Sequence, residues 1–144
     1  MRVPIQRLTD GKFIATIDFE ETPAGFEDVF NGSVFYRRYQ ETRAHGEYGS
    51  PDLTALTGNP TAQLMRRRGI EENRTCLTLI QIGYFDNRFL QMEVKPFGPF
   101  GNMMRNVIDT NEPHYLTFRI EQAENEEGEM VVTQITGADF TTAS

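Results

Sequence analysis

The stretch from residue 75 to residue 94 constrains the fold of this chain more than any other part of the sequence. Its first half is strongly apolar, and its second half alternates between apolar and polar side chains. Alternation with a period of two places every second side chain on the same face of a strand. Asp86 and Asn87 lie between the halves, and both residue types tolerate the positive φ angles of a tight turn. The stretch predicts a β-hairpin with one face on a core. Its inward-facing residues on the return strand are Leu90, Met92 and Val94.

Other segments predict further strands and short helices around this hairpin. Strand-like alternation is present in three ranges: residues 12–20, 115–121 and 129–136. Helical signals, such as a proline or a capping residue at the start, are present in two ranges: residues 61–68 and 102–109. Residues 33–40 fit either a short strand or a short helix. We expect one α+β domain over residues 1–144, a mainly antiparallel sheet or partial barrel with two short helices.

Length, charge and cysteine content exclude several classes of protein. A chain of 144 residues is long enough to bury a core without a disulfide or a metal. Its net charge of −7 argues against a surface that wraps nucleic acid. The single cysteine, Cys76, excludes an internal disulfide and a cysteine-rich zinc site, and we expect no metal and no cofactor. No apolar stretch reaches the roughly 20 residues that span a bilayer, and the first residues lack the apolar core of a signal peptide. We expect a cytoplasmic protein without membrane contact.

Two loops and the C-terminus complete the predicted organisation. Residues 41–60 are rich in glycine, proline, threonine and aspartate, which predicts a long loop of a kind that is often functional. The loop at residues 96–101 contains Phe97 and Phe100, which either pack on the edge of the core or form an aromatic patch for a partner. Residues 141–144 are expected to fray.

Within the first loop, residues 46–51 read Gly-Glu-Tyr-Gly-Ser-Pro. Together with the order of the predicted elements, this segment resembles the prohead maturation proteases of tailed phages, which share the herpesvirus assemblin fold. In that family a Gly-Glu-x-Gly segment precedes a histidine and a proline. Two further features are similar to the family. One is a Pro-x-Gly step at residues 99–101, and the other is an acidic turn with a glycine that precedes a Gly-x-Asp segment at residues 137–139. The resemblance extends from residue 31 to residue 144 and implies a prohead-protease-like fold.

The chain departs from that family at the positions that carry its chemistry. Ser50 stands where the family has its histidine, and a serine hydroxyl cannot usefully accept a proton at neutral pH. In the nucleophile strand, which reads Gly-Ile-Ser-Ser-Arg-Gly in the family, Thr117 and Phe118 occupy the two serine positions. Both flanking glycines are replaced by larger residues, and Arg119 alone is as expected. The resemblance implies a protein that has kept the protease fold, with its Gly-Glu-x-Gly geometry, and has lost the chemistry.

We accordingly expect a non-catalytic phage head protein, a pseudoprotease, that acts by binding. The resemblance implies capsid proteins, scaffold proteins or further copies of the chain as partners. It implies a location in the host cytoplasm during assembly and in the virion head afterwards. The residues expected to form the binding surfaces are Glu47, Tyr48, Asp52, Phe97, Phe100 and Arg119.

Two alternatives remain open at this point. The first is an active maturation endopeptidase of the serine or threonine type, in which Ser50 or Thr117 is the nucleophile and His45 or His114 replaces the missing base. One argument weighs against this alternative: histidines in loops are more often partly exposed residues without a catalytic role. The second alternative is a soluble binding domain with no link to phage heads, because one fold can serve unrelated functions.

Overall fold

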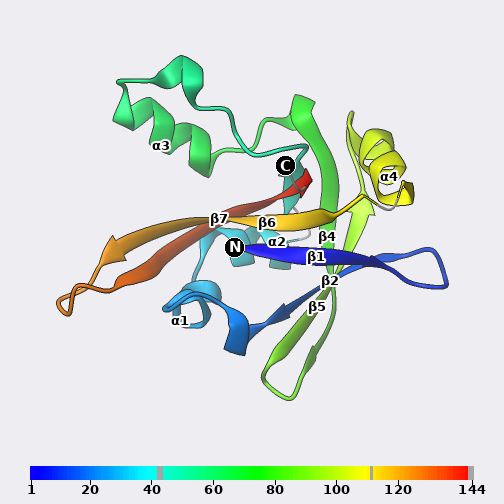
Figure 1. The fold of residues 1–144 in the computed structure, drawn as a ribbon, viewed down its shortest axis with the longest axis horizontal. Helices are drawn as coiled ribbons and strands as arrows, with labels where there is room; N and C mark the ends of the chain where they lie inside the picture. The colour runs from blue at the N-terminus through cyan, green and yellow to red at the C-terminus, as the bar shows by residue number, and fades with distance from the viewer. Residues whose placement is uncertain (42–43, 111, 143–144) are drawn as a thin grey trace.

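Seven strands form one antiparallel sheet in the computed structural model, which describes residues 1–41, 44–110 and 112–142 (Figure 1). Their order across the sheet is β3-β4-β5-β2-β1-β6-β7. The strands are β1 Arg2–Arg7, β2 Phe13–Asp18, β3 His45–Glu47, β4 Thr75–Phe85, β5 Phe89–Pro96, β6 His114–Glu124 and β7 Met130–Thr142. The α-helices are α1 Phe26–Phe30, α2 Val34–Gln40, α3 Pro60–Arg68 and α4 Gly101–Asp109. Short 3-10 helices cover Phe19–Glu21, Thr54–Leu56 and Glu72–Arg74.

The two edge strands approach each other, so that the sheet is nearly closed into a barrel. Tyr48, directly after β3, forms a parallel bridge with Phe140 of β7. The N–H group of Gly49 donates a hydrogen bond to the carbonyl oxygen of Phe140 over 2.7 Å. The expected α+β class with a mainly antiparallel partial barrel is confirmed, although the described residues contain four α-helices where two were expected.

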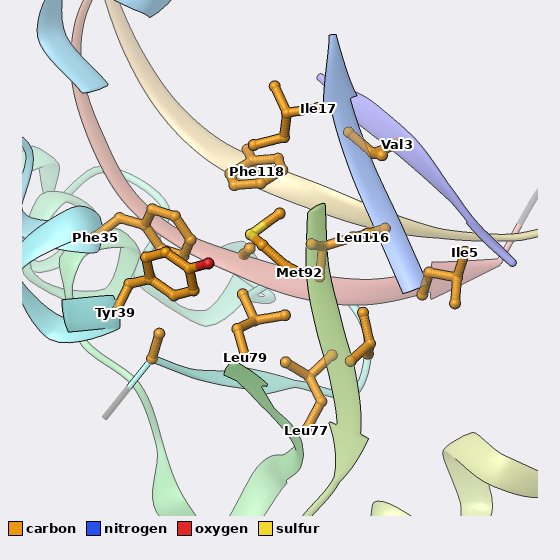
Figure 2. Packing of buried hydrophobic residues seen from close by; sticks show 14 of the residues in the cluster. Val3, Ile5, Ile17, Phe35, Tyr39, Leu77, Leu79, Met92, Leu116 and Phe118 are labelled. Carbon is orange, nitrogen blue, oxygen red and sulfur yellow. The ribbon is translucent and has the colours of Figure 1, made fainter. Parts of the chain in front are cut away.

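Apolar side chains from the sheet and α2 fill the interior of the barrel (Figure 2), and Phe26 and Phe30 of α1 belong to the same buried cluster. The ring of Phe118, on β6, stands edge-on to Phe26 of α1 and Phe35 of α2, with ring centroids 5.8 Å and 5.3 Å apart. Edge-to-face pairs of this kind are worth roughly 0.5–1.5 kcal/mol beyond the burial of their area. The two helices are therefore held against the sheet by aromatic packing.

The predicted β-hairpin is confirmed as β4 and β5. Asp86 and Asn87 have φ angles of 52° and 53°, as the tight turn between the strands requires. The side chains predicted to point inward are all buried: Leu90, Met92 and Val94. Residues 33–40 contain the helix α2, because the Ser33 hydroxyl caps its first turn by accepting a hydrogen bond from the Tyr36 N–H group.

Some elements differ from the expectation. β1 contains Pro4, which interrupts a strand pattern, and α1 has five residues, too few for a periodic signal. The loop at residues 41–60 includes β3 and the 3-10 helix Thr54–Leu56. No helix in the described part of the chain is long and apolar enough to cross a membrane.

The end of the chain also differs from the expectation. β7 continues through Thr142, and its residues Thr141 and Thr142 pair with Tyr115 and His114 of β6. These two residues, which were predicted to fray, thus belong to the β6–β7 ladder in the structure. The remaining part of that prediction, residues 143–144, lies outside the described residues.

The hydroxyl group of Tyr39 has no hydrogen-bond partner among the described residues, although Tyr39 is buried. Figure 2 shows its oxygen within the apolar cluster, beside Phe35. An unsatisfied buried hydroxyl costs about 1–3 kcal/mol. We expect Tyr39→Phe to raise the free energy of unfolding by about 1 kcal/mol in urea denaturation. Tyr36→Phe, on the same helix but half-buried, is the control and should leave stability nearly unchanged. A destabilised Tyr39→Phe variant would contradict the assignment.

Candidate functional site

Ser50 and Thr117, the predicted catalytic positions, lie together at two neighbouring cavities. One cavity has a volume of about 380 Å³, the other of about 260 Å³, and both are lined by Ser50 and Thr117. The first extends toward Arg2 of β1. The second follows β6 from Thr117 to Glu121 and is also lined by Arg67 of α3. We call the two cavities together the Ser50–Thr117 groove.

Local structure explains why these two residues meet. On β6, Leu116 and Phe118 point into the core, so the alternation of the strand turns Thr117 to the outer face. Gly49 adopts a φ angle of 82°, which glycine accepts without strain, and its hydrogen bond to Phe140 holds the loop against β7. This turn leaves the next residue, Ser50, exposed beside Thr117.

The hydroxyl group of Thr117 is hydrogen-bonded to another hydroxyl. Its Oγ1 atom lies 2.6 Å from Oγ1 of Thr141, on the neighbouring strand β7. A hydroxyl nucleophile needs a base that accepts its proton, and a threonine hydroxyl does not fill that role at neutral pH. The observed contact positions Thr117 but does not activate it.

Both histidines make their hydrogen bonds elsewhere. Nδ1 of His45 lies 3.2 Å from Oε2 of Glu72, and the His45 ring packs against Phe97 with centroids 4.4 Å apart. Nδ1 of His114 lies 2.7 Å from the carbonyl oxygen of Glu112. Within the described residues, neither histidine lines the Ser50–Thr117 groove or is hydrogen-bonded to Ser50 or Thr117.

Directly beside the groove, two carboxylates and two arginines form a buried cluster. Arg119 donates hydrogen bonds to Asp139 over 2.7 Å and 2.9 Å, and to Glu47 over 2.9 Å. Arg66 binds both oxygens of Glu47, over 2.9 Å and 2.5 Å. The backbone N–H group of Glu47 donates to Asp139 over 2.9 Å. We call these four residues the Glu47 cluster; they join β3, β6, β7 and α3.

The charges of the Glu47 cluster balance inside the protein. The side chain of Glu47 has no exposed surface, and those of Asp139 and Arg119 are 1% and 7% exposed. Although burial opposes it, hydrogen bonds from Arg66, the Glu71 N–H group and Arg119 lower the pKa of Glu47 to about 2. Burial raises the pKa of Asp139 against the influence of Arg119. Such a cluster is sustained only by complete hydrogen bonding, so each member depends on the others.

Arginines, and not an apolar face, attach α3 to the sheet. None of the residues of α3 is buried. Its last turn contains Arg66, which binds Glu47, and Arg68, which binds both carboxylate oxygens of Glu121 on β6 over 2.7 Å and 2.6 Å. The carbonyl oxygen of Arg67 accepts a hydrogen bond from Arg119. Figure 1 shows the result: α3 lies on one side of the β6–β7 ribbon and α1 on the other.

The Gly-Glu-x-Gly segment has a structural role at each defined position. A Cβ atom on Gly46 would lie 2.3 Å from the carbonyl oxygen of Ala138, so only glycine lets β3 approach β7 this closely. Glu47 belongs to the buried cluster, and Gly49 supplies the positive φ angle of the turn. Sequence reasoning did not foresee the cluster. The signal that could have found it is that Glu47, Arg119 and Asp139 lie in the three segments on which the sequence resemblance rests.

The expected binding residues differ in their burial. Glu47 has no exposed surface and cannot contact a partner directly. Arg119 lines the second cavity but is only 7% exposed and is held by the cluster, so we reassign both residues to a structural role. Tyr48 is half-buried between the rings of Phe100 and Phe140, with centroids 5.9 Å and 5.5 Å away. At the surface remain Asp52, whose carboxylate accepts a hydrogen bond from the Thr54 N–H group, and Phe97, which is 42% exposed.

The depressed pKa of Glu47 predicts a pH dependence of stability. A carboxyl group whose pKa is lower in the folded state than in the unfolded state stabilises the fold. This contribution is fully present at pH values above the unfolded-state pKa of 4.5, and it is lost as the pH falls toward the folded-state pKa of about 2. Between pH 6 and pH 4, linkage gives a loss of about 1 kcal/mol. We expect the stability advantage of wild type over the isosteric Glu47→Gln variant to shrink by about that amount in urea denaturation at the two pH values. An advantage that does not change with pH would contradict this account.

The described residues contain no group of three or more histidine, cysteine, aspartate or glutamate side chains suited to hold a metal ion. No family model and no curated protein matches the chain. Among solved structures, the chain is similar to the bacteriophage T4 capsid assembly protease gp21, with a TM-score of 0.49 and 14% sequence identity. The match covers 97% of this chain and 90% of gp21. The likeness is one of fold.

Proposed function

We propose that this chain is a non-catalytic protein of phage head assembly with a prohead-protease-like fold, and that it acts by binding capsid or scaffold proteins. The observation that carries the proposal is the bonding at the Ser50–Thr117 groove. Thr117 is paired with the hydroxyl of Thr141, while His45 and His114 are engaged with Glu72 and Glu112. A groove of this kind offers contacts to a polypeptide without the base that cleavage needs.

The distribution of charge supports the same proposal. The residues that correspond to family motifs, Glu47, Arg119 and Asp139, are used to hold strands together and are not free for chemistry. Retaining this cluster preserves the shape of the groove, because it fixes β6 and β7 directly behind Thr117. Shape and exposed groups are sufficient for binding, whereas catalysis also needs activated groups.

Binding can be tested with the capsid and scaffold proteins of the phage that encodes this chain. The immobilised chain would be titrated with each protein and the dissociation constant measured by biolayer interferometry. We expect Ser50→Trp, which fills the groove from an exposed position, to weaken binding at least about 10-fold by displacing the ligand. Thr9→Trp, at an exposed turn outside the groove, is the matched control and should bind like wild type.

Two outcomes would count against the proposal. If none of the head proteins binds wild type, the chain is not a head-assembly binding protein. If Ser50→Trp and Thr9→Trp bind equally well, the partner uses another surface, and the groove has no role in recognition.

A further inference from the structure

The two lobes of the Ser50–Thr117 groove share their central residues, so they form one elongated depression. In the second lobe, β6 contributes the consecutive residues from Thr117 to Glu121, facing the loop residues Ser50, Pro51 and Leu53. Four steps along a strand cover about 13 Å. A depression that follows a strand over this distance fits an extended polypeptide segment of about four or five residues better than a compact ligand.

The carboxylates that line the groove are already neutralised. Glu121 is held by Arg68, with both of its oxygens bonded, and Asp139 is held by Arg119 in the Glu47 cluster. These carboxylates therefore contribute little net negative charge to a ligand in the groove.

Two arginines that line the groove form no ion pair among the described residues. Arg67, on α3, lines the second lobe and is exposed. Its charge contributes to the lowered pKa of Glu121, but its guanidinium group forms no ion pair among the described residues, so it is available to a second carboxylate. Arg2, on β1, lines the first lobe, and the contact found for its guanidinium group is with the ring of Tyr115, 4.6 Å away. Two cations thus lie in different lobes, on either side of the hydroxyl groups of Ser50 and Thr117.

We infer that the Ser50–Thr117 groove binds an extended acidic segment of a partner protein, with one carboxylate at Arg2 and another at Arg67. This inference rests on the proposed binding function and names the chemistry of the partner. Guanidinium groups bind carboxylates with two parallel hydrogen bonds, which gives both affinity and direction. The exposed hydroxyl of Ser50 is positioned to donate to a backbone carbonyl between the two acidic side chains.

The inference can be tested with a fluorescent heptapeptide of alternating glutamate and alanine, and with versions in which glutamine or lysine replaces every glutamate. Fluorescence anisotropy would give the dissociation constant of each for the full chain. A partly exposed ion pair is worth up to about 1 kcal/mol, which is roughly fivefold in affinity. We expect the glutamate peptide to bind more tightly than the glutamine peptide, and Arg2→Gln and Arg67→Gln each to weaken it about fivefold.

Arg37→Gln is the matched control, because it removes the same charge from an exposed arginine outside the groove, and it should bind the glutamate peptide like wild type. Equal affinity for the glutamate and glutamine peptides, or equal effects of Arg37→Gln and Arg67→Gln, would overturn the inference. Absence of binding by the glutamate peptide would overturn it as well. Each of these three results would leave the proposed function standing if Ser50→Trp still weakens binding of the head proteins at least about 10-fold, so failure of the inference and failure of the proposed function can be told apart.

Discussion

Replacing Arg119 with methionine is expected to lower the free energy of unfolding by about 3–5 kcal/mol. The guanidinium group donates to Asp139, to Glu47 and to the carbonyl oxygen of Gly69 over 2.6 Å. Methionine has a similar length but no donor, so two buried carboxylates would lose their shared partner. Leaving a buried charge uncompensated is far more costly than the net value of the pair itself. Few single substitutions in a domain of this size have a larger effect.

Chemical denaturation monitored by circular dichroism measures this loss. Arg37→Met is the control, because Arg37 is exposed, and a surface substitution usually changes stability by less than about 0.5 kcal/mol. Arg119→Lys should fall between the two, since lysine keeps the charge but cannot bind Asp139 through two parallel hydrogen bonds. A loss of less than about 1 kcal/mol for Arg119→Met would refute the structural role given to the Glu47 cluster.

Gly46→Ala is the second substitution with a large expected effect, a loss of about 3 kcal/mol. The added Cβ atom would lie 2.3 Å from the carbonyl oxygen of Ala138 and 2.8 Å from Cδ1 of Leu77. The first contact is with backbone, so relief requires β3 to move away from β7. That movement would also pull Glu47 from the cluster, since Glu47 is the next residue on β3.

Gly32→Ala provides the matched control for this substitution. A Cβ atom on Gly32 would have no atom within 4 Å, so the same chemical change should be nearly neutral in stability. Thermal denaturation of the two variants side by side separates crowding from any general effect of replacing glycine. Similar melting temperatures for both variants would show that β3 does not approach β7 as closely as described.

Local patterns in the sequence predicted those parts of the fold that local interactions determine. The β4–β5 hairpin was predictable because its period of two and its Asp86-Asn87 turn are adjacent in sequence. The start of α3 was likewise marked by Pro60, which lies in its first turn. By contrast, β1 and α1 are short, and they are stabilised by neighbours that are distant in sequence: β1 pairs with β2 and β6.

The same distinction between local and long-range interactions applies to the candidate site. Ser50 and Thr117 were named from their positions in a motif, and the structure brings them to one groove. The Glu47 cluster was not foreseen, because nothing local indicates which carboxylate will meet which arginine after folding. Arg66 illustrates this point: within three consecutive arginines it resembles a solvated residue, yet its side chain is only 13% exposed and binds Glu47. Long-range strand pairing decides such contacts, and no short window of sequence contains them.

The proposed function is tested most directly by incubating the purified chain with capsid and scaffold proteins of a phage head and following their masses by intact-mass spectrometry. The account predicts that every partner protein keeps its full mass over the incubation, while binding to the chain is detected in the same mixture. Specific cleavage of a head protein that disappears in the Thr117→Ala variant would contradict the account and would identify the chain as an active endopeptidase.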